Sequence, residues 1–183
     1  MNNISLYSDT MTANTRLNCA KQRAENLAIL LHPGAKVLEM CVGPSLRRLE
    51  KEYAKYSISC AGNDIDPRWK DYYPGGRWMI GDALDLDVTG FDAIIFAPPL
   101  SMGCSGRRED SLSLEKVNPS YRSFLHAYRN YHGIKVMVLP GRTLSVRHDR
   151  SEFYKLLNEL TDYDVVPLKD KVTKYVDIYI GSR

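Results

Sequence analysis

A buried strand followed by a glycine-containing turn decides the fold of this chain. The strand is Lys36-Val37-Leu38-Glu39-Met40-Cys41, and the turn is Val42-Gly43-Pro44-Ser45. The next segment is a helix, because apolar residues recur there at spacings of three and four: Leu46, Leu49, Tyr53 and Tyr56. A strand, a tight turn and a helix in this order are typical of the first half of a β-α-β unit, which predicts a parallel sheet.

The rest of the chain continues the alternation. Further strands are predicted at residues 57–62, 77–80, 91–96 and 134–139, and a closing pair at 164–168 and 172–180. One helix precedes the first strand and ends at His32-Pro33-Gly34. After a long loop over 101–117, another helix is predicted to begin at Asn118 and Pro119 and to pack Tyr121 and Tyr128 in the core. The last predicted helix covers 153–160. The predicted fold class is therefore α/β: a Rossmann-like, mostly parallel seven-stranded sheet with helices on both faces and a C-terminal antiparallel hairpin.

Length and composition fit one globular domain. The chain has 183 residues, of which 44% are hydrophobic and 26% charged. We expect a single domain, with an N-terminal helical segment at 1–34 and a Rossmann-like core at 35–183. The net charge of +3 neither requires nor excludes a nucleic-acid partner.

The location and the partners are less constrained. No apolar run approaches the roughly 20 residues of a membrane span, and the first residues do not read as a signal peptide. The four cysteines form no CxxC pair, so reduced thiols, a cytoplasmic location and no metal site are expected. The sequence gives no indication of the oligomeric state.

Acidic residues follow two of the predicted strands. Gly62-Asn63-Asp64-Ile65-Asp66-Pro67 ends the second strand, and Asp64 lies 21 residues after Gly43, where nucleotide-binding folds place a carboxylate for ribose hydroxyls. Ile80-Gly81-Asp82-Ala83-Leu84 follows the third strand. Taken singly, either stretch is equally compatible with a solvated acidic turn, and Asp66 is expected to be one.

A pair of prolines ends the fourth predicted strand. Phe91-Asp92-Ala93-Ile94-Ile95-Phe96 is followed by Ala97-Pro98-Pro99-Leu100. Consecutive prolines give a rigid, extended backbone without N–H donors, at the edge where α/β sheets place ligands. Taken alone, the prolines are equally compatible with a loop that merely ends a strand.

Together, in this order, the four stretches resemble the motifs of class I S-adenosylmethionine-dependent methyltransferases. The resemblance implies S-adenosyl-L-methionine as cofactor, with binding residues at Glu39, Cys41, Gly43, Asp64, Ile65, Asp82 and Ala83. Glu39 would serve the amino-acid end of the cofactor through water, Asp64 the ribose, and Ile65 and Asp82 the adenine. Cys41 and Ser45 stand where the family has glycines.

The double proline resembles the Asp/Asn-Pro-Pro-aromatic motif of methyltransferases that act on nitrogen. It implies an acceptor slot shaped by Ala97, Pro98, Pro99 and Leu100, and transfer of the methyl group to a nitrogen of a nucleic-acid base. Ala97 lacks the acceptor side chain of the family motif, and Leu100 lacks its aromatic ring. A small-molecule or protein methyltransferase, or a partner subunit that binds the cofactor without catalysis, are the alternatives.

Two basic loops could contact RNA or DNA on the acceptor side. Substrate-binding candidates are Ser101, Arg107 and Arg108 after the prolines, and Arg142 after the fifth strand. Since both loops leave the same edge of the predicted sheet, they could form a basic rim. Solvated arginines, or arginines paired with nearby acidic residues, are the alternative.

Overall fold

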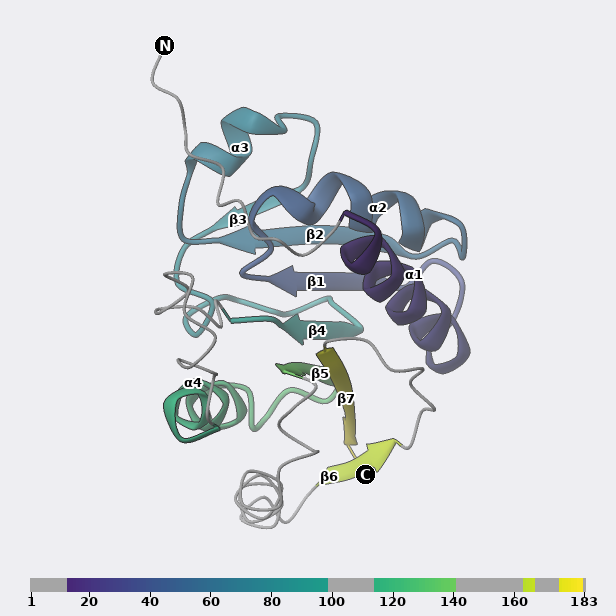
Figure 1. Cartoon of the computed structure of the whole chain (residues 1–183). Coiled ribbons are helices and arrows are strands. Elements are labelled where there is room, and N and C mark those ends of the chain that lie inside the picture. Colours follow the sequence, from purple (N-terminus) through teal and green to yellow (C-terminus); the bar gives the residue numbers. More distant parts are fainter. Residues whose placement is uncertain (1–12, 99–113, 141–162, 167–174, 183) are drawn as a thin grey trace.

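A single mixed sheet organises the molecule (Figure 1). The computed structural model describes residues 13–98, 114–140, 163–166 and 175–182. Within them lies a seven-stranded sheet in the order β3-β2-β1-β4-β5-β7-β6. Its strands are β1 (Lys36–Met40), β2 (Ser59–Asp64), β3 (Trp78–Ile80), β4 (Ala93–Phe96), β5 (Ile134–Pro140), β6 (Tyr163–Val166) and β7 (Tyr175–Ser182). The first five strands are parallel, and β7 is antiparallel to both β5 and β6, which confirms the predicted fold class.

The strand order reverses direction at the centre of the sheet. From β1 the chain moves outward through β2 to β3, and β4 then returns to the other side of β1. In such sheets, ligands bind where the order reverses, outside the carboxyl ends of the strands. Met40 and Phe96 are paired in register at those ends of β1 and β4, so the turn after β1 and the Ala97-Pro98 segment leave the same edge.

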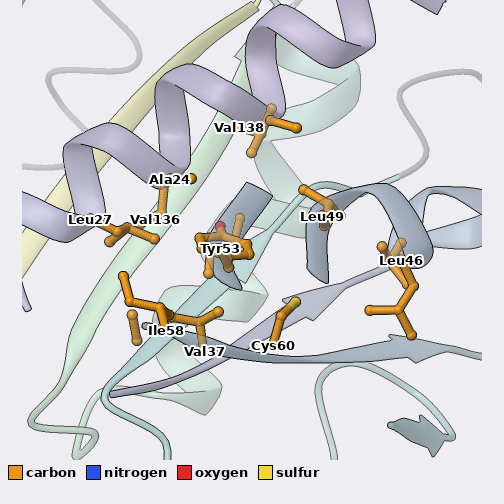
Figure 2. Packing of buried hydrophobic residues seen from close by; sticks show 14 of the residues in the cluster. Ala24, Leu27, Val37, Leu46, Leu49, Tyr53, Ile58, Cys60, Val136 and Val138 are labelled. Atoms are coloured by element: carbon orange, nitrogen blue, oxygen red, sulfur yellow. The ribbon is translucent and has the colours of Figure 1, made fainter. Parts of the chain in front are cut away.

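Helices cover both faces. The helices α1 (Ala13–Leu30) and α2 (Leu46–Ala54) pack on one face, and α4 (Leu114–Ala127) packs on the other (Figure 1). Figure 2 shows Tyr53 of α2 in the middle of the first core, among Ala24 and Leu27 of α1 and residues of the strands. In the second core the rings of Phe96 and Phe124 stack with their centroids 4.6 Å apart. Tyr121 and Tyr128 are buried there, as predicted.

Several predicted boundaries were wrong. The second strand begins at Ser59 rather than residue 57, because Ser57 has a left-handed φ of +59° that ends the preceding turn, and it extends to Asp64. The helix α4 begins at Leu114, inside the predicted loop, so Pro119 is within it rather than at its start. Of the closing strands, β6 begins at Tyr163 rather than residue 164, and β7 ends at Ser182 rather than residue 180, while residues 167–174 lie outside the described residues. The predicted turn at residues 42–45 contains a single turn of 3-10 helix at Gly43–Ser45. The short helix α3 (Arg68–Tyr72) was not predicted. The predicted helix at 153–160 lies outside the described residues.

A buried arginine joins three elements on the α1 face. Nη1 of Arg23 lies 3.1 Å from both carboxylate oxygens of Glu39 on β1. Its Nε and Nη2 atoms donate to Asp177 of β7 at 2.6 and 3.0 Å. Tyr53 donates its hydroxyl to Glu39 at 2.6 Å, and burial followed by the charge of Glu39 raises the pKa of this phenol. We call Arg23, Glu39, Tyr53 and Asp177 the Arg23 clamp; it fixes α1 and α2 against the centre of the sheet.

The described part of the chain lacks two features, a membrane-spanning helix and a metal-binding cluster. None of its helices has the length and apolar character needed to cross a membrane. Among these same residues, no three His, Cys, Asp or Glu side chains gather as a group that could hold a metal ion.

Candidate functional site

The turn after β1 uses two left-handed residues. Cys41 has a φ of +57° and Gly43 a φ of +50°. A non-glycine residue in this region is held there only by its surroundings, at a cost of about 1–3 kcal/mol. The turn is fixed by a hydrogen bond from Val42 N to Asn63 O at 2.9 Å. An unfavourable backbone conformation at the carboxyl end of a central strand marks the turn as a candidate functional segment.

Gly62 allows the turn to pack closely on β2. A Cβ atom at this position would lie 2.8 Å from side-chain atoms of both Leu46 and Val42, closer than real Cβ contacts. The first residue of α2 and the turn itself therefore rest directly on the β2 backbone. The sequence shows this glycine but not its role, because the role depends on how closely the two segments approach.

Asp64, which the sequence places 21 residues after Gly43, lies against the turn. Its Oδ2 atom accepts a hydrogen bond from Gly43 N at 2.9 Å, and its Oδ1 atom accepts one from Asp66 N at 3.0 Å. A carboxylate can accept about four hydrogen bonds, so about two remain for a ligand. Asp66 instead forms an exposed ion pair with Arg68, whose hydrogen bonds lower the pKa of Asp66. The structure thus distinguishes the two neighbouring carboxylates.

The loop after β3 is fastened beside Asp64. Gly81 N donates to Asp64 O at 3.1 Å, and the Asn63 amide donates to Met79 O and Gly81 O, both at 2.9 Å. Asn63 is fully buried, and within the described part of the chain its Oδ1 atom has no hydrogen-bond partner. Asn63 was not among the predicted residues, because in the sequence it resembles an ordinary turn residue next to Asp64.

Asp82 and Ala83 are presented differently in this loop. The Asp82 side chain is exposed, and its Oδ1 atom accepts from Leu84 N at 2.9 Å. Ala83 is buried, and its carbonyl oxygen accepts from the Tyr128 hydroxyl at 2.5 Å. The loop is therefore held by Asn63 and Tyr128 while the Asp82 carboxylate stays accessible.

Electrostatics place Cys41, Asp64 and Asp82 in one neighbourhood. Burial, with smaller contributions from the charges of Asp64 and Asp82, raises the pKa of the Cys41 thiol to about 12. The thiol is therefore protonated at neutral pH, which excludes it as an activated nucleophile.

Apolar groups stand exposed next to these carboxylates. Ile65 follows Asp64 and is 71% exposed, while Ile80 is paired with Asp64 in the sheet and is 39% exposed. The indole of Trp69, on α3, lies 3.9 Å from where a Cβ atom of Gly43 would be. The edge thus offers carboxylate acceptors beside apolar surfaces, the combination that a nucleoside requires. Trp69 was not among the predicted residues.

Glu39 is not available in the way that we predicted. Only 2% of it is exposed, and its carboxylate belongs to the Arg23 clamp rather than to the edge of the sheet. Its side chain lies on the α1 face because it shares that side of β1 with Val37. The predicted role at the amino-acid end of a cofactor is therefore replaced by a structural one.

The described part of the predicted acceptor slot is short. Ala97 is half-buried against the core under α1 and α2, and Pro98 is buried. The other predicted residues of the acceptor side lie outside the described residues: Pro99, Leu100, Ser101, Arg107, Arg108 and Arg142.

Comparison with solved structures identifies the architecture. The chain superposes on TrmN from Thermus thermophilus with a TM-score of 0.57 at 15% identity, over 89% of this chain and 48% of that one. It superposes on the glycopeptide N-methyltransferase MtfA, solved with S-adenosyl-L-methionine, with a TM-score of 0.58 at 10% identity, over 90% and 94%. The chain has the class I methyltransferase fold. A proposed tRNA (m1A22) methyltransferase, Sp1610 of Streptococcus pneumoniae, gives 0.54 at 12% identity, over 88% and 69%.

At these identities the likeness establishes the fold alone. The chain spans about half the length of TrmN and nearly the whole of MtfA. No protein-family model matches the sequence, and no curated protein sequence does either.

Proposed function

We propose that this chain binds S-adenosylmethionine at the carboxyl edge of β1, β2 and β3 and transfers its methyl group. The observation that carries the proposal is the hydrogen bond from Gly43 N to Asp64, which joins the left-handed turn to the carboxylate expected for ribose. The methyltransferase fold supports the choice of cofactor over a dinucleotide.

The residues present fit this cofactor. Asp64 has about two acceptor positions left for the ribose hydroxyls, and the exposed Asp82 carboxylate can accept from the adenine amino group. Ile65 offers an exposed apolar surface for the adenine ring. The turn with its left-handed residues Cys41 and Gly43 lies at the same edge. Glu39 is left out of this set because it belongs to the Arg23 clamp.

The protein contributes alignment rather than acid–base chemistry. When bound, the cofactor supplies a methyl group already activated by its sulfonium. The chain would hold an acceptor in line with that methyl group, so that the new bond to the acceptor forms as the bond to sulfur breaks. The Ala97-Pro98 segment leaves the sheet beside the β1 turn, which is where such an acceptor would have to be held.

The acceptor that we propose is a nitrogen of an RNA or DNA base. The Pro98 carbonyl oxygen could accept a hydrogen from an exocyclic amine, leaving the nitrogen lone pair free for the methyl group. The basic residues Arg107, Arg108 and Arg142 would contact phosphates. A small-molecule acceptor is the second candidate, because MtfA, an N-methyltransferase for a glycopeptide, has the same fold over nearly its whole length.

A methyl-transfer assay tests the proposal. With S-adenosylmethionine labelled at the methyl carbon, label should appear in a base of RNA or DNA, and Ala97→Asn should raise turnover by restoring the side-chain acceptor of the family motif. The Arg107→Ala, Arg108→Ala double variant should weaken nucleic-acid binding and leave cofactor affinity unchanged.

The outcomes separate the alternatives. Label found only in small molecules would replace the nucleic acid as substrate. Cofactor binding without transfer to any acceptor would indicate a partner subunit that has lost catalysis.

A further inference from the structure

Trp69 occupies a position that the proposed function leaves unused. It lies on α3, the short helix that follows β2 and stands near the arrowhead of β2 in Figure 1. Two of its six-membered-ring atoms, Cε2 and Cζ2, lie 3.9 Å from the position of a Gly43 Cβ, and the Asp64 carboxylate lies 4.0 Å from that same position. The indole and the Asp64 carboxylate therefore both lie next to Gly43, at the ribose end of the proposed site.

The ring is held but not enclosed. Trp69 is half-buried, and Tyr72 packs edge-on against it with the ring centroids 6.1 Å apart. Its backbone is fixed by hydrogen bonds from Trp69 N to Asp66 O at 3.3 Å and from Tyr73 N to Trp69 O at 3.0 Å. A preorganised aromatic surface next to a carboxylate loses little conformational entropy when a ligand packs on it.

We infer that Trp69 forms the outer wall of the cofactor site and contacts the nucleoside end of S-adenosylmethionine. The inference rests on the proposed function and adds a binding residue to it. A sugar or purine ring held by Asp64 would have the indole on one side and the exposed Ile65 nearby, so apolar contact would supplement the hydrogen bonds. The methionine end, which lacks a ring, would gain nothing from Trp69.

The second tryptophan provides a matched control. The chain has two tryptophans, Trp69 and Trp78. Trp78 lies on β3, its Nε1 atom donates to Tyr73 O at 2.9 Å, and it packs against the core under α1 and α2. It also borders a cavity of about 310 Å³ that includes Lys36 and Ser59, the first residues of β1 and β2. Trp78 is thus held by its own hydrogen bond and core contacts, and it is paired in the sheet with Gly62, two residues before Asp64 on β2.

Tryptophan fluorescence and calorimetry together test the inference. S-adenosylmethionine should change the emission of the wild-type protein and of Trp78→Phe, and should leave that of Trp69→Phe nearly unchanged. By calorimetry, Trp69→Ala should weaken binding by about threefold to tenfold, the usual value of an aromatic contact, while Trp69→Phe should retain most of the affinity. The same loss is expected with 5′-methylthioadenosine, which keeps the nucleoside and lacks the amino-acid end.

The outcomes distinguish this inference from the proposed function. No heat on titrating the wild-type protein would contradict the proposed function, and this inference with it. Two results would overturn the inference alone. In the first, Trp78→Phe binds S-adenosylmethionine by calorimetry but its fluorescence emission stays constant. In the second, the change in emission survives in Trp69→Phe and disappears in Trp78→Phe. Because Trp69 is still present in Trp78→Phe, the fluorescence measurement on that variant tests the inference even if Trp69→Ala does not fold.

Discussion

Cys41 shows how one residue can be constrained by both backbone and charge. The family that this turn resembles has glycine here, and the chain instead holds a side chain at a φ of +57°. That side chain packs partly against the core under α4 and faces the Asp64 and Asp82 charges. The thiol can be tolerated because it is small and stays neutral, which gives a testable consequence.

We expect Cys41 to resist alkylation in the folded protein. Its pKa of about 12 lies well above the value of a free thiol, so the reactive thiolate is scarce until the pH approaches 12. At pH 8, labelling of Cys41 by iodoacetamide should be more than about a hundredfold slower than that of the same residue in urea-unfolded protein. Residue-resolved mass spectrometry measures both rates. Equal labelling rates in the folded and unfolded protein would contradict the conclusion that Cys41 is buried close to the Asp64 and Asp82 carboxylates.

At the scale of elements, the Arg23 clamp decides how α1 joins the sheet. Arg23 holds two carboxylates from strands that are far apart in sequence, and Arg23, Glu39 and Asp177 are all largely buried. A buried ion pair is weak evidence for net stabilisation, but removing one partner is costly because the other charge stays buried and unpaired. Substituting Arg23 alone would leave two buried carboxylates, Glu39 and Asp177, without their cation.

Arg23→Met should therefore destabilise the fold by about 3–5 kcal/mol, measured as the change in free energy of unfolding in urea. Lys21→Ala, on the same helix, is the control: its pair with Glu25 is exposed and 3.8 Å long, and its loss should cost at most about 0.5 kcal/mol. A similar small change for both variants would show that the clamp does not connect α1 to the sheet.

Elements were more predictable than contacts. The strands β1 and β4 are short apolar runs bounded by turn residues, and the sequence alone located both of them. The short helix α3 was missed because Arg68–Tyr72 is too brief to show a period. Glu39 was assigned to the cofactor because no local sequence pattern indicates its pairing with Arg23 and Tyr53, which lie 16 and 14 residues away.

The same difference applies to the site. The 21-residue spacing singled out Asp64 as the carboxylate at the end of the second strand, and its hydrogen bond with Gly43 forms because parallel strands end at the same edge. The roles of Asn63 and Gly62 depend on distances of a few ångströms between backbones, which a sequence pattern does not contain. Trp69 was missed for the same reason.

At the scale of the whole molecule, topology gathers the site. The carboxyl ends of β1, β2 and β4 point to one edge, seen in Figure 1 as arrowheads that face the same way. The turn with Cys41 and Gly43, the Asp64 carboxylate and the Ala97-Pro98 segment come from three different strands, and the reversal of strand order at β1 brings them together. The central claim is that this edge binds S-adenosylmethionine through Asp64.

Calorimetric titration of S-adenosylmethionine into the wild-type protein and Asp64→Ala tests that claim most directly. The wild-type protein should bind one equivalent, and loss of a charge-assisted hydrogen-bonding group worth roughly 1.5–3 kcal/mol should weaken binding by about tenfold to a hundredfold in the variant. Asp66→Ala, which removes a neighbouring carboxylate already paired with Arg68, should bind like the wild type. Equal affinity in a folded Asp64→Ala protein, or binding of a nicotinamide dinucleotide in place of S-adenosylmethionine, would contradict the account.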